Sequence, residues 1–192
     1  NIGVVEVAKA PPDGYTLVVT ATNNFVINQF IMKMPVDPLT ALVPVAKLAD
    51  VPRVLFSTPA VPAKNFAEFM VYVKANPGKV NFGSPAPGTV NHLLLERVKQ
   101  VRGLDMQHIP YRGSPQAAMA LLQNDIQLFT VGLAAGIGHL KEVKFTALAV
   151  ATDQRLSELP DVPTLIESGL PGFTGANWWG MAAPAGTPGR PP

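Results

Sequence analysis

The sequence predicts an α/β fold in which a mostly parallel sheet carries helices on both faces. Short apolar runs with the length of buried strands alternate with segments whose apolar residues recur at helical spacing. The 20 prolines and 16 glycines stand between these runs without a period, as expected for turns between many short elements. This alternation favours parallel strands, because parallel neighbours need crossover connections and helices usually supply them.

The first predicted elements are the end of a helix and two strands. Ile2–Ala10 has the pattern of a helix end, and Tyr15–Thr20 has that of a buried strand after the turn Pro11–Gly14. Val51–Ser57 predicts the next strand. A helix should follow it, with Asn65 as N-cap and Glu68 three residues later. The apolar residues of that helix are Phe66, Phe69, Met70 and Val73.

The middle and end of the chain continue the alternation. A helix with one apolar side is predicted over Val90–Val101, and Ser114 as N-cap with Pro115 at the first position begins another. Val162–Ser168 predicts a short helix that Gly169 closes. The remaining predicted strands are Val80–Phe82, Met106–Ile109, Ile126–Thr130, Thr146–Val150 and Phe173–Ala182.

Composition excludes several classes of function. The net charge is +2 and the basic residues are scattered, so the basic stripe of a nucleic-acid-binding protein is missing. The absence of cysteine excludes a thiol nucleophile, a cysteine-ligated zinc site and disulfides. No segment is long and apolar enough to predict a membrane span.

Three loops qualify as a binding site, because ligands of parallel sheets bind beyond the carboxyl ends of the strands. They are residues 21–24, 83–89 and 110–114, and all are small, polar and followed by predicted helices. The candidate ligand-binding residues in them are Ala21, Thr22, Asn23, Asn24, Gly83, Ser84, Gly88, Thr89, Tyr111, Gly113 and Ser114.

The loop 83–89 could hold an anion. Backbone N–H groups at the helix start and the hydroxyls of Ser84 and Thr89 are suitable donors, and Gly83 and Gly88 allow close approach. The alternative is an ordinary strand-to-helix loop in which Thr89 only caps the helix. The loop matches neither the Walker A nor the Rossmann phosphate-binding pattern.

The other two loops leave the same choice open. In residues 110–114, Ser114 and the next amides could clamp a carboxylate, with Arg112 for charge and Tyr111 for shape; the alternative is a capped helix beside a surface arginine. In residues 21–24, the polar side chains of Thr22–Asn24 could hydrogen-bond a ligand, or form an Asx turn and a helix cap.

The sequence shows no constellation for catalysis or metal binding. His92, His108 and His139 do not stand at metal-ligand spacing, and a structural or solvent-facing role is expected for them. No nucleophile elbow is present. We therefore predict no catalytic residues, no metal and no cofactor. Trp178 and Trp179 are expected to be core strand residues, or else to pack between lobes or against a ligand.

Short motifs occur in a characteristic order over nearly the whole chain. They are Val7–Thr16, Asn76–Lys79, Asn81–Ser84, His108–Ser114, Ala147–Val150, Leu159–Thr164 and Ala183–Pro188. In their order and spacing they resemble the Bug family of extracytoplasmic receptors, which are the substrate-binding components of tripartite tricarboxylate transporters.

The resemblance implies a two-lobed Venus-flytrap fold, with residues 1–46 and 147–192 in lobe 1 and residues 47–146 in lobe 2. The three loops would line the cleft between the lobes. It also implies a monomeric periplasmic receptor, not an enzyme. This receptor would bind a di- or tricarboxylate, an acidic amino acid or an aromatic acid and pass it to membrane permease subunits.

Two rival functions stay open, a ligand sensor for a membrane signalling kinase and an enzyme acting on a small acid. Family members begin upstream with a signal peptide and a first strand, and they extend further at the other end, so an internal fragment is expected. Pro85 and Pro87 stand where the family usually has a glycine-rich loop. They should stiffen the loop and remove two N–H donors.

Overall fold

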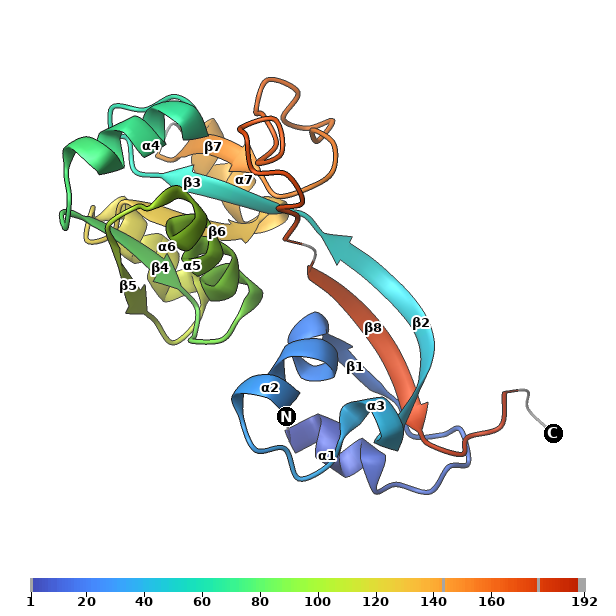
Figure 1. Cartoon of the computed structure of the whole chain (residues 1–192). Coiled ribbons are helices and arrows are strands. Elements are labelled where there is room, and N and C mark those ends of the chain that lie inside the picture. Colours follow the sequence, from blue (N-terminus) through green and yellow to red (C-terminus); the bar gives the residue numbers. More distant parts are fainter. Residues whose placement is uncertain (1, 143, 176, 190–192) are drawn as a thin grey trace. The chain divides into compact units, whose positions relative to one another are not determined.

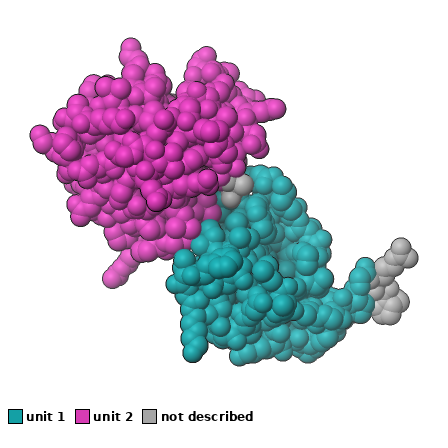
Figure 2. Space-filling view, viewed as in Figure 1, with its two compact units in different colours: residues 1–51, 177–192 teal, residues 52–176 magenta. Residues whose placement is uncertain are grey.

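The computed structural model describes residues 2–142, 144–175 and 177–189. The chain forms two compact units, which Figure 2 distinguishes by colour. Unit 1 comprises residues 1–51 and 177–192, and unit 2 comprises residues 52–176. Each unit has a sheet of its own, with three strands in unit 1 and five in unit 2.

These units differ from the predicted lobes at both boundaries. β2 (Leu42–Val51) stays paired with β8 (Asn177–Pro184) to its last residue, so residues 47–51 belong to unit 1. β7 (Thr146–Val150) pairs with β3 (Arg53–Ser57), so residues 147–176 belong to unit 2. Strand pairing sets both boundaries, and pairing partners far apart in the chain are not visible in a local pattern.

Unit 2 is built on a sheet in the order β5-β4-β6-β3-β7 (Figure 1). β4 pairs in parallel with β5 and β6, whereas β3 pairs antiparallel with β6 and β7. The predicted common direction therefore holds for every strand of this sheet except β3. The strands not yet defined are β4 (Val80–Ser84), β5 (Met106–Pro110) and β6 (Leu128–Gly132).

Helices cover both faces of this sheet, as predicted. α4 (Phe66–Ala75) and α5 (Val90–Arg102) pack on one face with Leu55 and Phe82, where the larger apolar core lies. α6 (Ser114–Leu122) and α7 (Leu133–Lys141) pack on the other face, with Val54, Phe56 and Phe129. Successive residues of β3 thus alternate between two cores, as the two-residue period of a strand requires.

The predicted start of α4 is correct. Asn65 caps α4 by accepting a 3.0 Å hydrogen bond from the Glu68 N–H. The Glu68 carboxylate accepts in return from the Lys64 N–H at 2.8 Å. Gly103 ends α5 in the left-handed region, with φ of 58°.

The predicted helix over residues 162–168 is wrong, because this segment forms only turns. Thr164 makes a β-bridge to Val150 at the end of β7, and its backbone must be extended there to pair. A single turn follows, held by a 3.0 Å hydrogen bond from the Ser168 N–H to the Thr164 carbonyl. Pairing with the sheet therefore prevents the helix from starting where the apolar pattern begins.

Unit 1 contains an antiparallel sheet in the order β1-β8-β2, with β1 at Val18–Ala21, so the prediction of mostly parallel strands is wrong for this unit. Its helical elements are α1 (Ile2–Ala8), a π-helical segment (Asn23–Ile27), α2 (Asn28–Ile31) and α3 (Pro38–Ala41). Its buried core is small and consists of Val4, Val7, Val18, Leu42 and Ala182.

The two tryptophans lie on β8, as predicted, but neither is a buried core residue. Trp179 is 43% exposed, and Trp178 is half-buried. The Trp178 ring stacks on Phe25, with ring centroids 5.4 Å apart and planes inclined by 18°. A side chain of β8 thus packs against the π-helical segment that follows β1.

α7 approaches β3 so closely that its facing position must lack a side chain. A Cβ at Gly136 would lie 2.3 Å from the Phe56 ring, whereas a Cβ at Gly138 would meet no atom within 4 Å. We expect Gly136→Ala to lower the free energy of unfolding by about 1–3 kcal/mol, because the ring must move. Gly138→Ala should raise it by up to about 1 kcal/mol through helix propensity.

The pair is compared by urea denaturation followed by circular dichroism. Both variants add one methyl group to the same helix, so they differ only in what that methyl group meets. Equal midpoints for the two variants would contradict the close approach of α7 to Phe56.

Candidate functional site

Three helices begin at one edge of the sheet of unit 2. β4, β5 and β6 run in the same direction, and α5, α6 and α7 follow them after short loops. Their N-termini therefore lie at the shared carboxyl edge, where N–H groups without an intrahelical acceptor and the helix dipoles favour an anion. The first of these groups in α7, the Leu133 N–H, already donates to the Pro52 carbonyl at 3.1 Å. The sequence predicted two of these helix starts as site elements and did not include the start of α7.

The predicted loops 83–89 and 110–114 are held together. Ser84 lies opposite Pro110 in the parallel register. The Tyr111 N–H donates to the Ser84 carbonyl at 2.9 Å, and the Gly113 N–H donates to the Pro85 carbonyl at 3.0 Å. These bonds fix the second loop along the first.

Gly83 leaves little room for a side chain, since a Cβ there would lie 2.4 Å from Cδ1 of Ile126 and 3.4 Å from the Tyr111 ring. The seven candidate residues of unit 2 thus belong to two adjoining loops that follow β4 and β5, which are neighbouring strands of the sheet in Figure 1.

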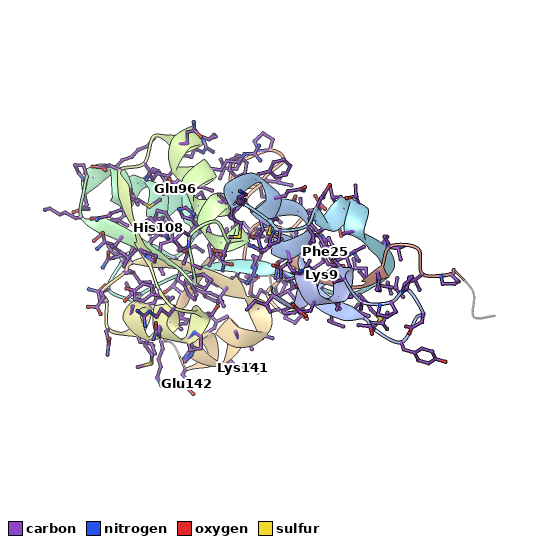
Figure 3. All side chains as sticks on the ribbon, turned by 90° about the horizontal axis from the view of Figure 1, so that it is seen from below. Lys9, Phe25, Glu96, His108, Lys141 and Glu142 are labelled. Carbon is purple, nitrogen blue, oxygen red and sulfur yellow. The ribbon has the colours of Figure 1, made fainter. Side chains whose placement is uncertain are left out.

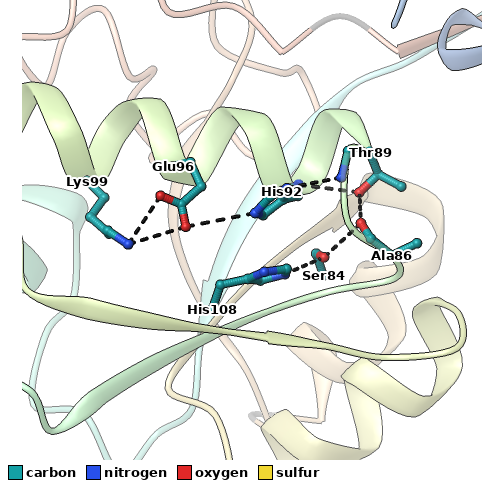
Figure 4. A network of polar contacts seen from close by, with 8 residues as sticks. Ser84, Ala86, Thr89, His92, Glu96, Lys99 and His108 are labelled. Carbon is teal, nitrogen blue, oxygen red and sulfur yellow. Dashed lines mark hydrogen bonds and ion pairs between the residues drawn. The ribbon is translucent and has the colours of Figure 1, made fainter. Parts of the chain in front are cut away.

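The hydroxyls of Ser84 and Thr89 hold the loop itself (Figure 4). Ser84 is fully buried, and its hydroxyl donates to the Ala86 carbonyl at 3.0 Å. The Thr89 hydroxyl donates to the same carbonyl at 2.8 Å and accepts from the His92 N–H at 3.4 Å. Thr89 is therefore the cap of α5, as the second interpretation of the sequence had it.

Two histidines that the sequence left separate are stacked against this loop. The rings of His92 and His108 have centroids 4.0 Å apart, and Phe82 lies 5.0 Å from His108. His92 Nδ1 accepts from the Gly88 N–H at 3.0 Å, and His108 Nε2 lies 2.7 Å from the Ser84 oxygen. Because Ser84 has already given its single proton to Ala86, His108 Nε2 must be the donor to Ser84.

The pair continues into a row of charges on α5. Glu96 lies 3.8 Å from His92 Nε2 and 3.1 Å from Lys99. Figure 3 labels Glu96 and His108 among the side chains of unit 2. Burial lowers the pKa of His108, and His92 and Lys99 lower it further, against an opposing effect of Glu96. His108 is therefore neutral at pH 7. The expected structural role of the histidines agrees with these contacts, but their proximity was not predicted.

The second predicted loop differs from expectation at its helix start. α6 begins at Ser114 with Gly113 as N-cap, and no side chain caps it, so the predicted N-cap role of Ser114 is wrong. Gly113 has φ of 123°, which side-chain-bearing residues rarely adopt. Arg112 is exposed, as in the alternative of a surface arginine beside the helix. Tyr111 is half-buried, and this burial raises its pKa, with Asp125 adding to the effect.

The predicted loop of unit 1 is tied to β8. The Thr22 hydroxyl donates to the Trp178 carbonyl at 3.1 Å and accepts from the Trp178 N–H at 2.9 Å. The Asn24 side chain donates to the Thr20 hydroxyl and accepts from Asn28 at 2.9 Å. Ala21 ends β1, and Asn23 begins the π-helical segment. Thr22 makes no side-chain cap bond, so the expected cap of a helix is not formed.

Unit 1 also contains an apolar cavity of about 440 Å³. Its walls include Phe25, Leu39, Leu42, Trp178 and Met181, and Lys47 is the one charged residue among the residues lining it. None of the four candidate residues of this unit lines the cavity. Figure 3 labels Phe25, which follows them directly in the sequence.

Neither a metal centre nor a membrane span is found in the residues that the structure describes. Within these ranges, no three His, Asp or Glu side chains gather as metal ligands would. No helix among them has the length and apolarity to cross a membrane.

Comparison with known proteins gives one consistent family. The family model described as "Tripartite tricarboxylate transporter family receptor" matches residues 1–190. A UPF0065 protein of Bordetella pertussis is 35% identical over 187 residues, which are 97% of this chain and 58% of that protein. Protein BugT of the same organism is 33% identical over 188 residues and is covered to the same 58%. The chain thus spans little more than half the length of these relatives.

Solved structures agree with these relatives. One described as a periplasmic transporter is 35% identical with a TM-score of 0.87, covering 97% of this chain and 63% of that one. A protein of R. palustris, solved with adipate, is 32% identical with a TM-score of 0.86, and the match covers 98% of this chain and 63% of that one. MatC from Rhodopseudomonas palustris, with bound malate, is 29% identical with a TM-score of 0.79, and the match covers 97% of this chain and 64% of that one. The predicted two-lobed α/β fold class is confirmed, with this chain as a part of it.

The lowered pKa of His108 makes the stability of unit 2 depend on pH. The neutral ring is favoured in the fold, while the unfolded chain titrates near pH 6.5. The stabilisation is therefore complete above about pH 6.5 and is lost as the pH falls from there through the folded pKa. His108→Gln can still donate to Ser84 and should lose less stability than the wild type between pH 7.5 and 5.

Urea midpoints at the two pH values test this expectation. His139→Gln is the matched control, because His139 packs on Phe145 in another part of unit 2. If His108→Gln and the wild type lost the same stability on acidification, the neutral state assigned to His108 would be incorrect.

Proposed function

The chain belongs to the tripartite tricarboxylate transporter receptor family, and on this premise we propose that its protein reversibly binds a small organic carboxylate for such a transporter. The predicted resemblance to the Bug family is confirmed by this membership. The proteins matched here are periplasmic solute-binding receptors and not enzymes. We propose the periplasm as the location and the membrane subunits of the transporter as the partner.

The convergence of three helix starts at the sheet edge of unit 2 carries this proposal. Thr89 caps only the third amide of α5, that of His92, which leaves the Val90 and Asn91 N–H groups without an intrahelical acceptor. A carboxylate placed there would accept hydrogen bonds from backbone donors that are already oriented. The neighbours solved with adipate and malate are consistent with a ligand of this class.

Binding without chemistry fits the residues around this edge. Ser84 and His108 lie at the distance of a nucleophile and its base, but Ser84 is fully buried and directs its proton to Ala86. No substrate could reach its oxygen without opening the loop. In this proposal Ser84, Gly88 and Thr89 shape the loop, while Tyr111 and Gly113 fix the neighbouring one. The four candidates of unit 1 stay a prediction.

Thermal unfolding with a panel of acids tests the proposed function. The panel contains malate, adipate, citrate, glutamate and benzoate, and the full-length gene product is used. An acid present at a hundred times its dissociation constant should stabilise the protein by about 2.7 kcal/mol. A shift with one acid and not with its close analogues would support a receptor. If no acid shifted the midpoint, the proposal would have to be abandoned.

A proline substitution tests the role of the helix amides. Val90 is the first residue of α5, where proline fits the helix and removes only an N–H that has no intrahelical acceptor. Val90→Pro should weaken binding by about tenfold to a hundredfold, since a hydrogen bond to a charged group contributes about 1.5–3 kcal/mol. Val90→Ala keeps the N–H and serves as the control in calorimetric titrations. Equal affinities of the two variants would exclude this amide from the site.

A further inference from the structure

Arg53 is a basic residue at the same edge of the sheet, outside the three candidate loops. It is the first residue of β3 and lies opposite Gly132, the last residue of β6. Because β3 runs against β6, its amino end shares the edge where β4, β5 and β6 end. The Arg53 carbonyl accepts from the Ala151 N–H at 2.8 Å, which fixes its backbone beyond the end of β7.

The side chain of Arg53 projects from the face of the sheet that α5 covers. Arg53 and Leu55 stand two residues apart in β3, so they share a face, and Leu55 packs in the core with Leu95 and Val98 of α5. Leu55 lies opposite Thr130, whose carbonyl accepts from the Asn91 side chain in the first turn of α5. Arg53 thus lies one pleat, or about 7 Å, beyond the row that α5 contacts.

Arg53 is half-buried and has no counter-charge. Its guanidinium makes no ion pair and no hydrogen bond with the residues that the structure describes, and its Nε is fully buried without an acceptor. Burial lowers the pKa of this guanidinium. Even partial removal of a cation from water is unfavourable when no counter-charge is near. An anion from outside the chain would offset that cost.

Three other arginines of unit 2 have contacts within the fold for at least part of the guanidinium. Arg155 binds Glu167 and the Pro160 carbonyl, and Arg97 stacks on Phe173 at 4.5 Å. Arg102, at the far end of α5, donates through Nη2 to the carbonyls of Ser168 and Gly169, although its Nε, like that of Arg53, is buried without an acceptor. Arg53 differs from them because its guanidinium makes no such contact with the residues that the structure describes, and it lies at the edge where the helix N-termini are found.

We propose that Arg53 binds a second carboxylate of the ligand, so that the site selects a dicarboxylate. This inference rests on the proposed function, in which the amides at the start of α5 hold the first carboxylate. β4 and β3 are separated by β6 alone, so about 10 Å separates the strand that leads into α5 from the strand that carries Arg53. An extended dicarboxylate and the arginine side chain can together span that distance. The fixed fork of a guanidinium suits a carboxylate.

The proposal is tested by a thermodynamic cycle, in which one carboxylate of the ligand and the charge of Arg53 are removed separately and together. Calorimetric titrations measure adipate and malate, each beside its monoamide, against the full-length wild type and Arg53→Met. In the wild type, we expect each diacid to bind at least tenfold more tightly than its monoamide. In Arg53→Met, that ratio should fall to near one. Arg53→Lys keeps the positive charge but loses the two-pronged geometry of the guanidinium, and it should retain part of the preference for the diacid over the monoamide.

Arg102→Met is the matched control, because it removes the same charge from the opposite end of α5 and should leave the ratio unchanged. An Arg53→Met variant that kept the wild-type ratio would overturn the proposal. So would an equal loss of affinity for diacid and monoamide, which would indicate a purely structural role. Either result leaves the proposed function standing, whereas a wild type that bound no acid at all would remove both.

Discussion

β4 and β5 pair in parallel with Ser84 opposite Pro110, and the organisation of the sheet edge follows from this register. It places Phe82 opposite His108, so that the two rings stack, and brings the Tyr111 N–H to the Ser84 carbonyl. A slip of one residue would turn His108 to the opposite face of the sheet. The stack on His92, the bond to Ser84 and the contact between the loops would all be lost together.

The polar groups of this edge divide into those that build the loops and those that stay open to a ligand. Two hydroxyls converge on the Ala86 carbonyl, and the Gly88 N–H is directed to His92. Pro85 cannot donate, and its carbonyl instead accepts from Gly113. What stays open are backbone amides inside the helix starts. The positions of such backbone donors are set by the fold. A substitution of one side chain therefore changes the shape of the site but leaves its hydrogen-bond donors in place.

The sequence predicted most elements of unit 2 and the loops at their ends, because strand runs, helix periodicity and caps such as Asn65 and Thr89 are local signals. It did not predict the reversed direction of β3, the turns after Thr164 or the unit boundaries, since each depends on pairing between distant residues. The same limit applies to function. Arg53 is an ordinary strand arginine in the sequence, and His92 and His108 meet only through the β4–β5 register. The hydroxyls of Ser84 and Thr89 were predicted as donors to a ligand, whereas in the structure they hold the loop itself.

The close packing of α7 against Phe56 lowers the intrinsic stability of this helix, because it requires a glycine. A helix with glycine at two of its nine positions has little intrinsic stability, so it depends on the sheet beneath it to stay folded. Such a helix opens locally at a lower free energy than its neighbours, and its amide hydrogens should exchange with solvent first. α7 also begins at the edge where an anion would bind. Binding of an anion there should therefore slow the exchange of the amide hydrogens of α7. The glycine that admits the aromatic ring thus makes α7 a natural reporter of the bound state.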